Sequence, residues 1–232
     1  MRERQKQILK AVVKEYQRTG QPVASQNVSE EYEFDFSPAT VRAEMLALDK
    51  DGFLEQPYTS AGRLPTDKAF RLFIDEWEEE IGQRQKEEIF EELERIHELA
   101  FKETAQILAD FSRSLGICGI FDPVKDFHEA GFKWLADEPE FGEGKIREVL
   151  RWLDSSPEED FENLAQEMED EVSVFIGREN PIKNLRNCSL MMASFEFDGQ
   201  RGIFGILGPK RMNYRKNEFI LKEAKKKINR NF

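Results

Sequence analysis

Residues 37–66 carry the two local signals that most restrict how this chain can fold. The first is Ser37-Pro-Ala-Thr-Val-Arg, where Ser37 can cap a helix and proline takes the first helical position, at which its missing N–H costs no hydrogen bond. The second is Thr59-Ser-Ala-Gly-Arg-Leu-Pro-Thr66, where Ala61-Gly62 predicts a hairpin turn and Arg63 a cation at its tip. Together they predict a recognition helix followed by a wing, a pairing that reads duplex DNA.

Apolar residues at helical spacing predict four helices within residues 1–78. Gly20 stops the first helix, Ser25 can cap the second, Gly52 ends the third and Thr66 can cap the fourth. The predicted buried positions are Ile8, Leu9, Val12, Val13, Tyr16, Val28, Tyr32, Val41, Met45, Leu48, Phe70, Phe73, Ile74 and Trp77. Three short helices with tight turns and a following hairpin predict a winged helix-turn-helix domain.

Residues 79–232 predict a second domain of the α+β class. The composition turns acidic from Glu78, which sets the boundary, and Gly82 can act as a hinge. The segments with strand character are 115–121, 172–177, 188–197 and 202–208, and residues 129–170 have helical character. Asp198-Gly199 is a hairpin signal between the last two strands, so we expect a small, largely antiparallel sheet.

The acidic segment 78–115 leaves two interpretations open. Ile89, Leu93, Ile96 and Ala100 follow heptad spacing, which fits either a helix packed within the fold or a seam between two copies of the chain.

The net charge of -12 is unusual for a DNA-binding protein, but it is unevenly distributed. Residues 1–75 carry a charge of -1, residues 201–232 carry +8, and the segment between them carries -19. A nearly neutral reading domain can bind phosphates if its cations share one face, while an acidic body limits non-specific binding. The lysines of 225–230 fit a polar helix end better than an electrostatic arm.

Several classes of protein are disfavoured by the sequence. No apolar run approaches the roughly 20 residues that span a bilayer, so we expect a cytoplasmic protein without membrane contact. Cys118 and Cys188 lie among apolar residues, as buried reduced thiols do. No phosphate loop, nucleophile elbow or metal-binding histidine pair is present, so we expect no enzyme activity, no cofactor and no metal.

These motifs resemble those of one family, the heat-inducible transcription repressor HrcA. Residues 37–42 and 59–68 are similar to its winged helix, and residues 175–181, 185–190 and 202–214 to its last strands. The resemblance implies a GAF-like domain in residues 79–232, a homodimer on an inverted repeat called CIRCE, and a GroEL-type chaperonin as partner. Family members are longer: the sequence after Phe121 omits several strands and most of an inserted dimerisation domain, so segment 78–115 is a candidate for the pairing.

The candidate DNA contacts come from the two opening signals. They are Ser37, Ala39, Thr40, Arg42 and Ala43 on the helix, and Thr59, Ser60, Arg63 and Lys68 on or after the hairpin. Arg42 can take a guanine edge or pair with a nearby carboxylate, and Thr40 can touch a thymine methyl. Arg63 at the tip can enter a minor groove or pair with phosphate, and Ser37 is explained as a cap in any case.

The sequence therefore predicts an α+β protein with an N-terminal winged helix-turn-helix and a reduced GAF-like domain. We expect a dimeric, sequence-specific repressor of heat-shock or chaperone genes. The alternative is a winged-helix regulator that senses a small molecule through the GAF-like domain.

Overall fold

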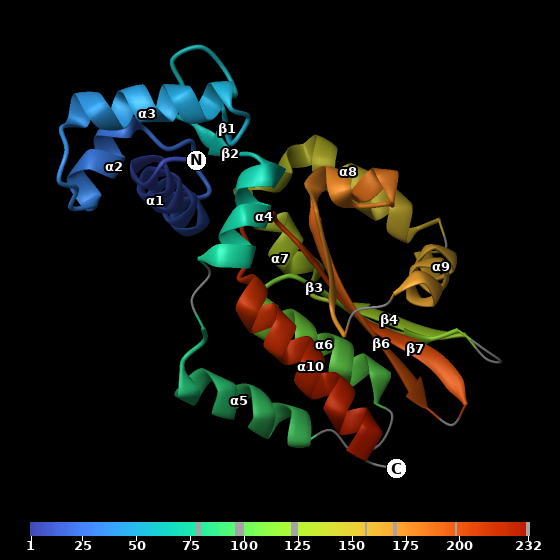
Figure 1. The fold of residues 1–232 in the computed structure, drawn as a ribbon. Helices are drawn as coiled ribbons and strands as arrows, with labels where there is room; N and C mark the ends of the chain where they lie inside the picture. Colours follow the sequence, from blue (N-terminus) through green and yellow to red (C-terminus); the bar gives the residue numbers. More distant parts are fainter. Residues whose placement is uncertain are drawn as a thin grey trace. The chain divides into compact units, whose positions relative to one another are not determined.

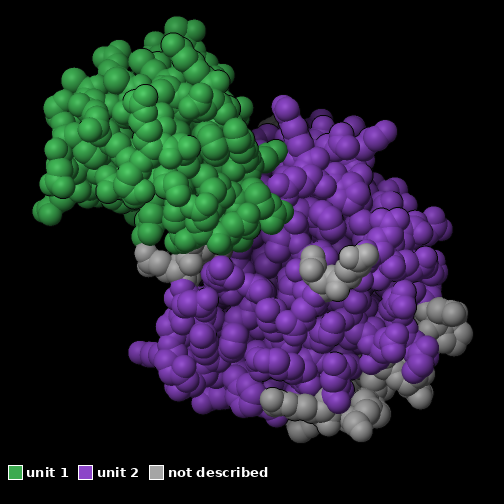
Figure 2. All heavy atoms as spheres, viewed as in Figure 1, with its two compact units in different colours: residues 1–78 green, residues 79–232 purple. Residues whose placement is uncertain are grey.

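The computed structural model describes residues 1–77, 80–95, 100–121, 125–155, 157–168, 171–197 and 199–230. The chain divides into two compact units, unit 1 (Met1–Glu78) and unit 2 (Glu79–Phe232), which Figure 2 colours separately. The expected boundary residue Glu78, Ile96 of the heptad pattern and Asp198 of the hairpin signal lie outside the described residues.

Unit 1 is a helical bundle with a two-stranded antiparallel sheet. Its elements are α1 (Glu3–Thr19), α2 (Ser25–Glu31), α3 (Pro38–Lys50), β1 (Leu54–Glu55), β2 (Leu64–Pro65) and α4 (Asp67–Glu76). Gly20 ends α1 with a φ of 65°, a left-handed conformation that glycine adopts at low cost. Thr66 caps α4 by accepting from the backbone of Ala69, and its hydroxyl donates to the carbonyl of Gly52 at 2.8 Å. This one side chain therefore joins the start of α4 to the turn after α3.

Unit 2 is built on one five-stranded sheet with the order β4-β3-β7-β6-β5, in which every pairing is antiparallel. Its strands are β3 (Leu115–Ile120), β4 (Asp126–Ala130), β5 (Ser173–Ile176), β6 (Ser189–Phe197) and β7 (Gln200–Gly208). Its α-helices are α5 (Gln83–Glu94), α6 (Phe101–Ser112), α7 (Phe132–Ala136), α8 (Gly142–Leu153), α9 (Pro157–Glu167) and α10 (Tyr214–Arg230). Short 3-10 turns cover Pro139–Phe141, Gly177–Glu179 and Lys183–Leu185. The predicted α+β class with a small antiparallel sheet is confirmed.

Helices cover both faces of the unit 2 sheet (Figure 1). On one face, Ile117 of β3 and Leu207 of β7 belong to a buried cluster with Val149 of α8 and Phe161 of α9. On the other face, α6 packs on β3 and α10 on β6, and Phe101 of α6 stacks near Phe195 of β6. The period-two alternation of the strands thus supplies two cores, one for each face.

The structure places the last two residues of β4 where the sequence predicted helix. Residues 129–130 end this strand, which pairs with β3 from Gly116↔Ala130 to Ile120↔Asp126. The segment Asp-Phe-His-Glu-Ala has few β-formers, so its pairing with a buried neighbouring strand determines its conformation. Cys118 on β3 and Cys188 are buried free thiols, and burial raises the pKa of Cys188 to about 12.

Three apolar positions of segment 78–115 are buried inside unit 2. Ile89 and Leu93 of α5 are 0% and 2% exposed, and α5 packs on α10. Leu108 of α6 is also fully buried. The packed-helix interpretation therefore accounts for these positions, which are not available as a surface seam. In the part of the chain that the structure describes, no helix is long and apolar enough to cross a bilayer.

Candidate nucleic-acid interface

The amino end of α3 is fixed by its cap, as the sequence predicts. The Ser37 hydroxyl accepts from the backbone N–H of Thr40 at 3.3 Å, and the two hydroxyl oxygens lie 3.0 Å apart. Pro38 occupies the first helical position. The Ser37 and Thr40 side chains are therefore in contact at the start of the helix, where Ser37 caps the first turn. Residues 37–39 remain exposed to solvent.

One face of α3 is exposed along its whole length. Val41, Met45 and Leu48 form the buried face. The exposed face consists of Ala39, Arg42, Ala43, Leu46 and Lys50, which are spaced at i, i+3, i+4, i+7 and i+11. Within the described part of the chain, the side chains of Arg42 and Lys50 have neither an ion pair nor a hydrogen bond. The helix thus presents two cations with the apolar side chains of Ala43 and Leu46 between them.

The loop between β1 and β2 turns earlier than predicted. The N–H of Ala61 donates to the carbonyl of Tyr58 at 3.0 Å, and Ser60 inside this turn has a φ of 73°. Thr59 and Ser60 are exposed at the turn. The expected Ala61-Gly62 turn is therefore wrong in position by two residues, because Thr59 and Ser60 are the central residues of the turn.

Gly62 has a different role from the one predicted. A Cβ at this position would lie 2.5 Å from the backbone carbon and oxygen of Val23. Glycine is needed because two backbone segments approach closely: Val23 and Arg63 form an antiparallel bridge with N–O distances of 2.9 and 2.8 Å. The loop is thereby pinned to the segment between α1 and α2.

The same bridge corrects the prediction for Arg63. Its Nε lies 2.7 Å from an oxygen of Asp49 on α3, and its side chain is only 14% exposed. Arg63 is therefore not a free cation at the loop tip. Its charge is neutralised by Asp49, and the pair ties the loop to the carboxyl half of α3.

Lys68 also lies away from the loop tip. Its ammonium donates to the carbonyl of Asp51 at 3.1 Å and lies 4.0 Å from the ring centre of Phe53. A cation that binds the last carbonyls of a helix stabilises the helix end. Lys68 therefore secures the end of α3.

A hollow of about 290 Å³ lies between α3 and the loop. Arg42, Leu46, Gln56 and Ser60 line it, and Gln56 donates to the carbonyl of Ala61 at 3.0 Å across the loop. The structure thus brings three of the predicted residues, Arg42, Ser60 and Arg63, to one site. Leu46 and Lys50 were missed by the sequence reasoning, although continuing the i+3 and i+4 steps from Arg42 and Ala43 would have found Leu46.

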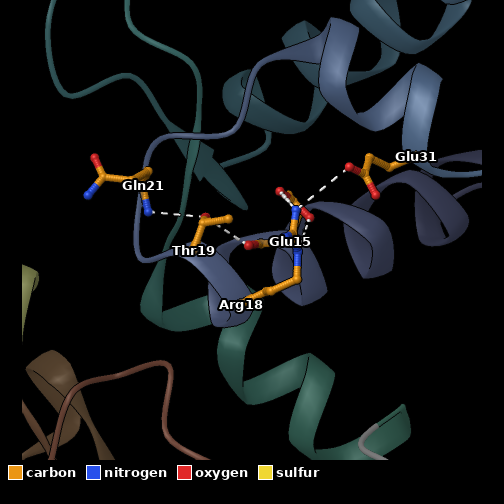
Figure 3. Close-up of polar contacts among 5 residues, drawn as sticks. All are labelled: Glu15, Arg18, Thr19, Gln21 and Glu31. Carbon is orange, nitrogen blue, oxygen red and sulfur yellow. Dashed lines mark hydrogen bonds and ion pairs between the residues drawn. The ribbon is translucent and has the colours of Figure 1, made fainter.

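Polar contacts at the end of α1 include one ion pair to α2 (Figure 3). Arg18 donates to both carboxylate oxygens of Glu15, at 2.7 and 3.1 Å, and lies 3.8 Å from Glu31 of α2. Thr19 donates to the carbonyl of Glu15, and the N–H of Gln21 donates to the Thr19 hydroxyl. The helix α2 also packs on α3.

Known proteins resemble this chain over nearly its whole length. The family model for the HrcA protein C-terminal domain matches residues 69–217. The heat-inducible transcription repressor HrcA of Natranaerobius thermophilus is 28% identical over 338 aligned residues, covering 97% of this chain and 98% of the relative. The protein of the same name from Thermodesulfovibrio yellowstonii is 26% identical over 325 residues, covering 92% and 93%.

The lengths of these alignments show that this chain is short. The alignment with the Natranaerobius protein has 338 positions and this chain has 232 residues, so many aligned positions have no residue here.

A crystal structure of a hypothetical protein has a similar fold, with a TM-score of 0.74, 18% identity and full coverage of both chains.

Proposed function

The chain belongs to the HrcA family of heat-inducible transcription repressors, and we propose that it represses transcription by binding duplex DNA through unit 1. In this proposal unit 1 is a winged helix-turn-helix in which α2 and α3 form the helix-turn-helix and the β1–β2 loop is the wing. Unit 2 is a reduced GAF-like domain.

The exposed face of α3 carries the proposal. Arg42 and Lys50 are its cations, and the contacts described for the chain leave both of them without a partner. A DNA-binding helix needs such unsatisfied donors because phosphates and base edges must replace only water, not an existing carboxylate. The hollow between α3 and the loop lies beside Arg42, where a phosphate backbone would run.

The proposed DNA contacts are of two kinds, those to base edges and those to phosphates. Arg42 is positioned to donate bidentately to a guanine edge in the major groove, and Ala39 and Ala43 allow close approach of the helix. Thr59 and Ser60 at the loop tip, with backbone donors near Ser37, would contact phosphates. The Thr40 hydroxyl is hydrogen-bonded to the Ser37 hydroxyl, so Thr40 stabilises the helix cap in this proposal and does not contact DNA. Arg63 and Lys68 position the loop and the end of α3.

Two reading heads are needed for useful specificity, because one helix contacts only a few base pairs. We propose a homodimer on an inverted repeat, with half-sites separated by about one helical turn or a multiple of it. Bound dimer would block transcription by occupying the promoter, and a GroEL-type chaperonin would act on the folded state of the repressor. Since Ile89 and Leu93 are buried in unit 2, the surface that joins two copies must involve other residues.

A second candidate function is sensing of a small molecule by unit 2. A hollow of about 430 Å³ lined by Ser194, Glu196, Arg201, Lys225 and Asn229 supports it. A metabolite screen for a raised melting temperature would test it, since a ligand that binds only the native state stabilises the protein. The face of the sheet toward α8 and α9 is filled by core side chains, so this candidate depends on the polar hollow alone.

Selection of bound duplexes from a random pool tests the main proposal. The proposal predicts enrichment of an inverted repeat, with sedimentation showing two chains per duplex. Enrichment of a single half-site would contradict the dimer, and recovery of no preferred sequence would contradict sequence-specific binding.

A further inference from the structure

Leu46 is a large apolar side chain on the exposed face of α3. It is 47% exposed, while Val41, Met45 and Leu48 on the other face of the helix are at most 3% exposed. Its place in the helix, one turn after Arg42 and three residues after Ala43, puts it on the same face as these two residues. It also lines the hollow next to the loop. Packing inside unit 1 therefore does not explain why a large apolar residue stands at position 46.

The surroundings of Leu46 define what could cover it. Arg42 and Lys50, four residues before and after it, are cations that no described residue neutralises. An apolar protein partner would have to bury these two charges, which costs free energy unless carboxylates match them. A duplex supplies phosphates for the cations, and the thymine C5 methyl is the apolar group that its major groove offers.

We propose that Leu46 is a specificity-determining residue that contacts a thymine methyl in the major groove. This inference rests on the proposed function of unit 1. Four residues of helix rise about 6 Å, so a guanine bound by Arg42 and the thymine bound by Leu46 would be about one or two base pairs apart. The pair would make each half-site read a guanine and a thymine at a fixed spacing.

Replacing thymine by deoxyuridine tests the contact, because it removes the methyl and leaves the hydrogen-bonding edge intact. Each thymine of the selected duplex is replaced in turn, and affinity is measured by fluorescence anisotropy with the full chain. The wild-type protein should lose about fourfold at one position of a half-site, the factor expected for one buried methyl group. Leu46→Ala should bind the thymine duplex about as weakly as the wild-type protein binds the deoxyuridine duplex. Replacing that thymine by deoxyuridine should not weaken the variant's binding further.

Lys50→Ala is the matched control on the same face. It should weaken binding to the thymine and deoxyuridine duplexes by equal factors. Circular dichroism and the melting temperature should be unchanged in Leu46→Ala, because the side chain is exposed.

The experiment distinguishes failure of the Leu46 contact from failure of the proposed function. If the wild-type chain selects a duplex but no thymine methyl matters, or if Leu46→Ala keeps the methyl dependence, Leu46 does not read thymine and the proposed function stands. If the wild-type chain selects no duplex, the proposed function fails, and this inference fails with it.

Discussion

Helices α3 and α10 both carry cations, but they use them differently. Arg42 and Lys50 of α3 are exposed, and neither is paired with any residue that the structure describes. In α10, Lys222 lies 3.2 Å from Glu171 and 2.9 Å from Glu218, and Lys227 lies 3.1 Å from Glu94. Residues 201–232 hold a charge of +8 and residues 1–75 hold -1, so charge counting alone would favour α10 as the DNA-binding helix.

The difference shows why pairing matters more than the number of cations. Exposed ion pairs contribute only about 0 to 1 kcal/mol to stability, yet they cancel the local field that a phosphate would meet. Lys222, Lys226 and Lys227 of α10 are each paired with a carboxylate of unit 2. The α3 cations stand on a helix whose own acids, Glu44 and Asp49, are paired with Arg4 and Arg63.

The largest expected effect concerns the packing of α5 on α10. Ile89→Ala should lower the free energy of unfolding of unit 2 by about 2 to 5 kcal/mol, because it leaves a cavity at a fully buried site. Urea unfolding followed by tryptophan fluorescence measures it. Phe90→Ala, at a neighbouring position that is 40% exposed, is the control and should change little. Equal stability of the two variants would mean that α5 is a surface helix.

The second effect compares the two helices directly. Arg42→Ala should weaken binding to the selected duplex by about 1 to 3 kcal/mol, the range for a bidentate contact to guanine. Lys222→Ala on α10 should leave the affinity within error, since this lysine is already bound to two carboxylates. Anisotropy titrations at one salt concentration give both values. An equal loss in the two variants would remove the distinction between α3 and α10.

A smaller effect separates positioning from contact at Arg63. If the pair with Asp49 holds the loop, then Arg63→Ala, Asp49→Ala and the double variant should each weaken binding by about threefold to tenfold. If Arg63 instead contacts DNA, Asp49→Ala should strengthen binding, because it frees the guanidinium. The three dissociation constants form a cycle that distinguishes these cases.

The smallest effect is on salt dependence. Lys50→Ala should lower the slope of log K against log salt concentration by about one, because one phosphate contact is lost. Lys226→Ala on α10 should leave the slope unchanged, since Lys226 lies 2.7 Å from Glu223. A slope that falls only in the second variant would place phosphates on α10.

Local signals in the sequence predicted the helices of unit 1, although Ser25 is the first residue of α2 and does not cap it. Ser37, Pro38, Thr66 and Gly20 act through neighbours within a few residues, so the residues themselves determine the helix ends. The predicted strands of unit 2 that alternate or run apolar, such as β6 and β7, were found for the same reason.

Features that depend on distant residues were not predictable. The place of Arg63 depends on a bridge to Val23 and an ion pair with Asp49, 40 and 14 residues before it in the chain. The conformation of β4 depends on pairing with β3. Arg42 is unpaired because no carboxylate of the described residues reaches it. The spacing of residues in the sequence does not predict this.

Photo-crosslinking tests most directly which helix lies on DNA. A benzophenone side chain replaces Ala43, which is exposed on α3, or Lys226, which is exposed on α10, in the full chain bound to the selected duplex. We predict crosslinks to DNA from position 43 and none from position 226. Crosslinks from position 226 alone, at a protein concentration that saturates the duplex, would contradict the assignment of DNA binding to α3.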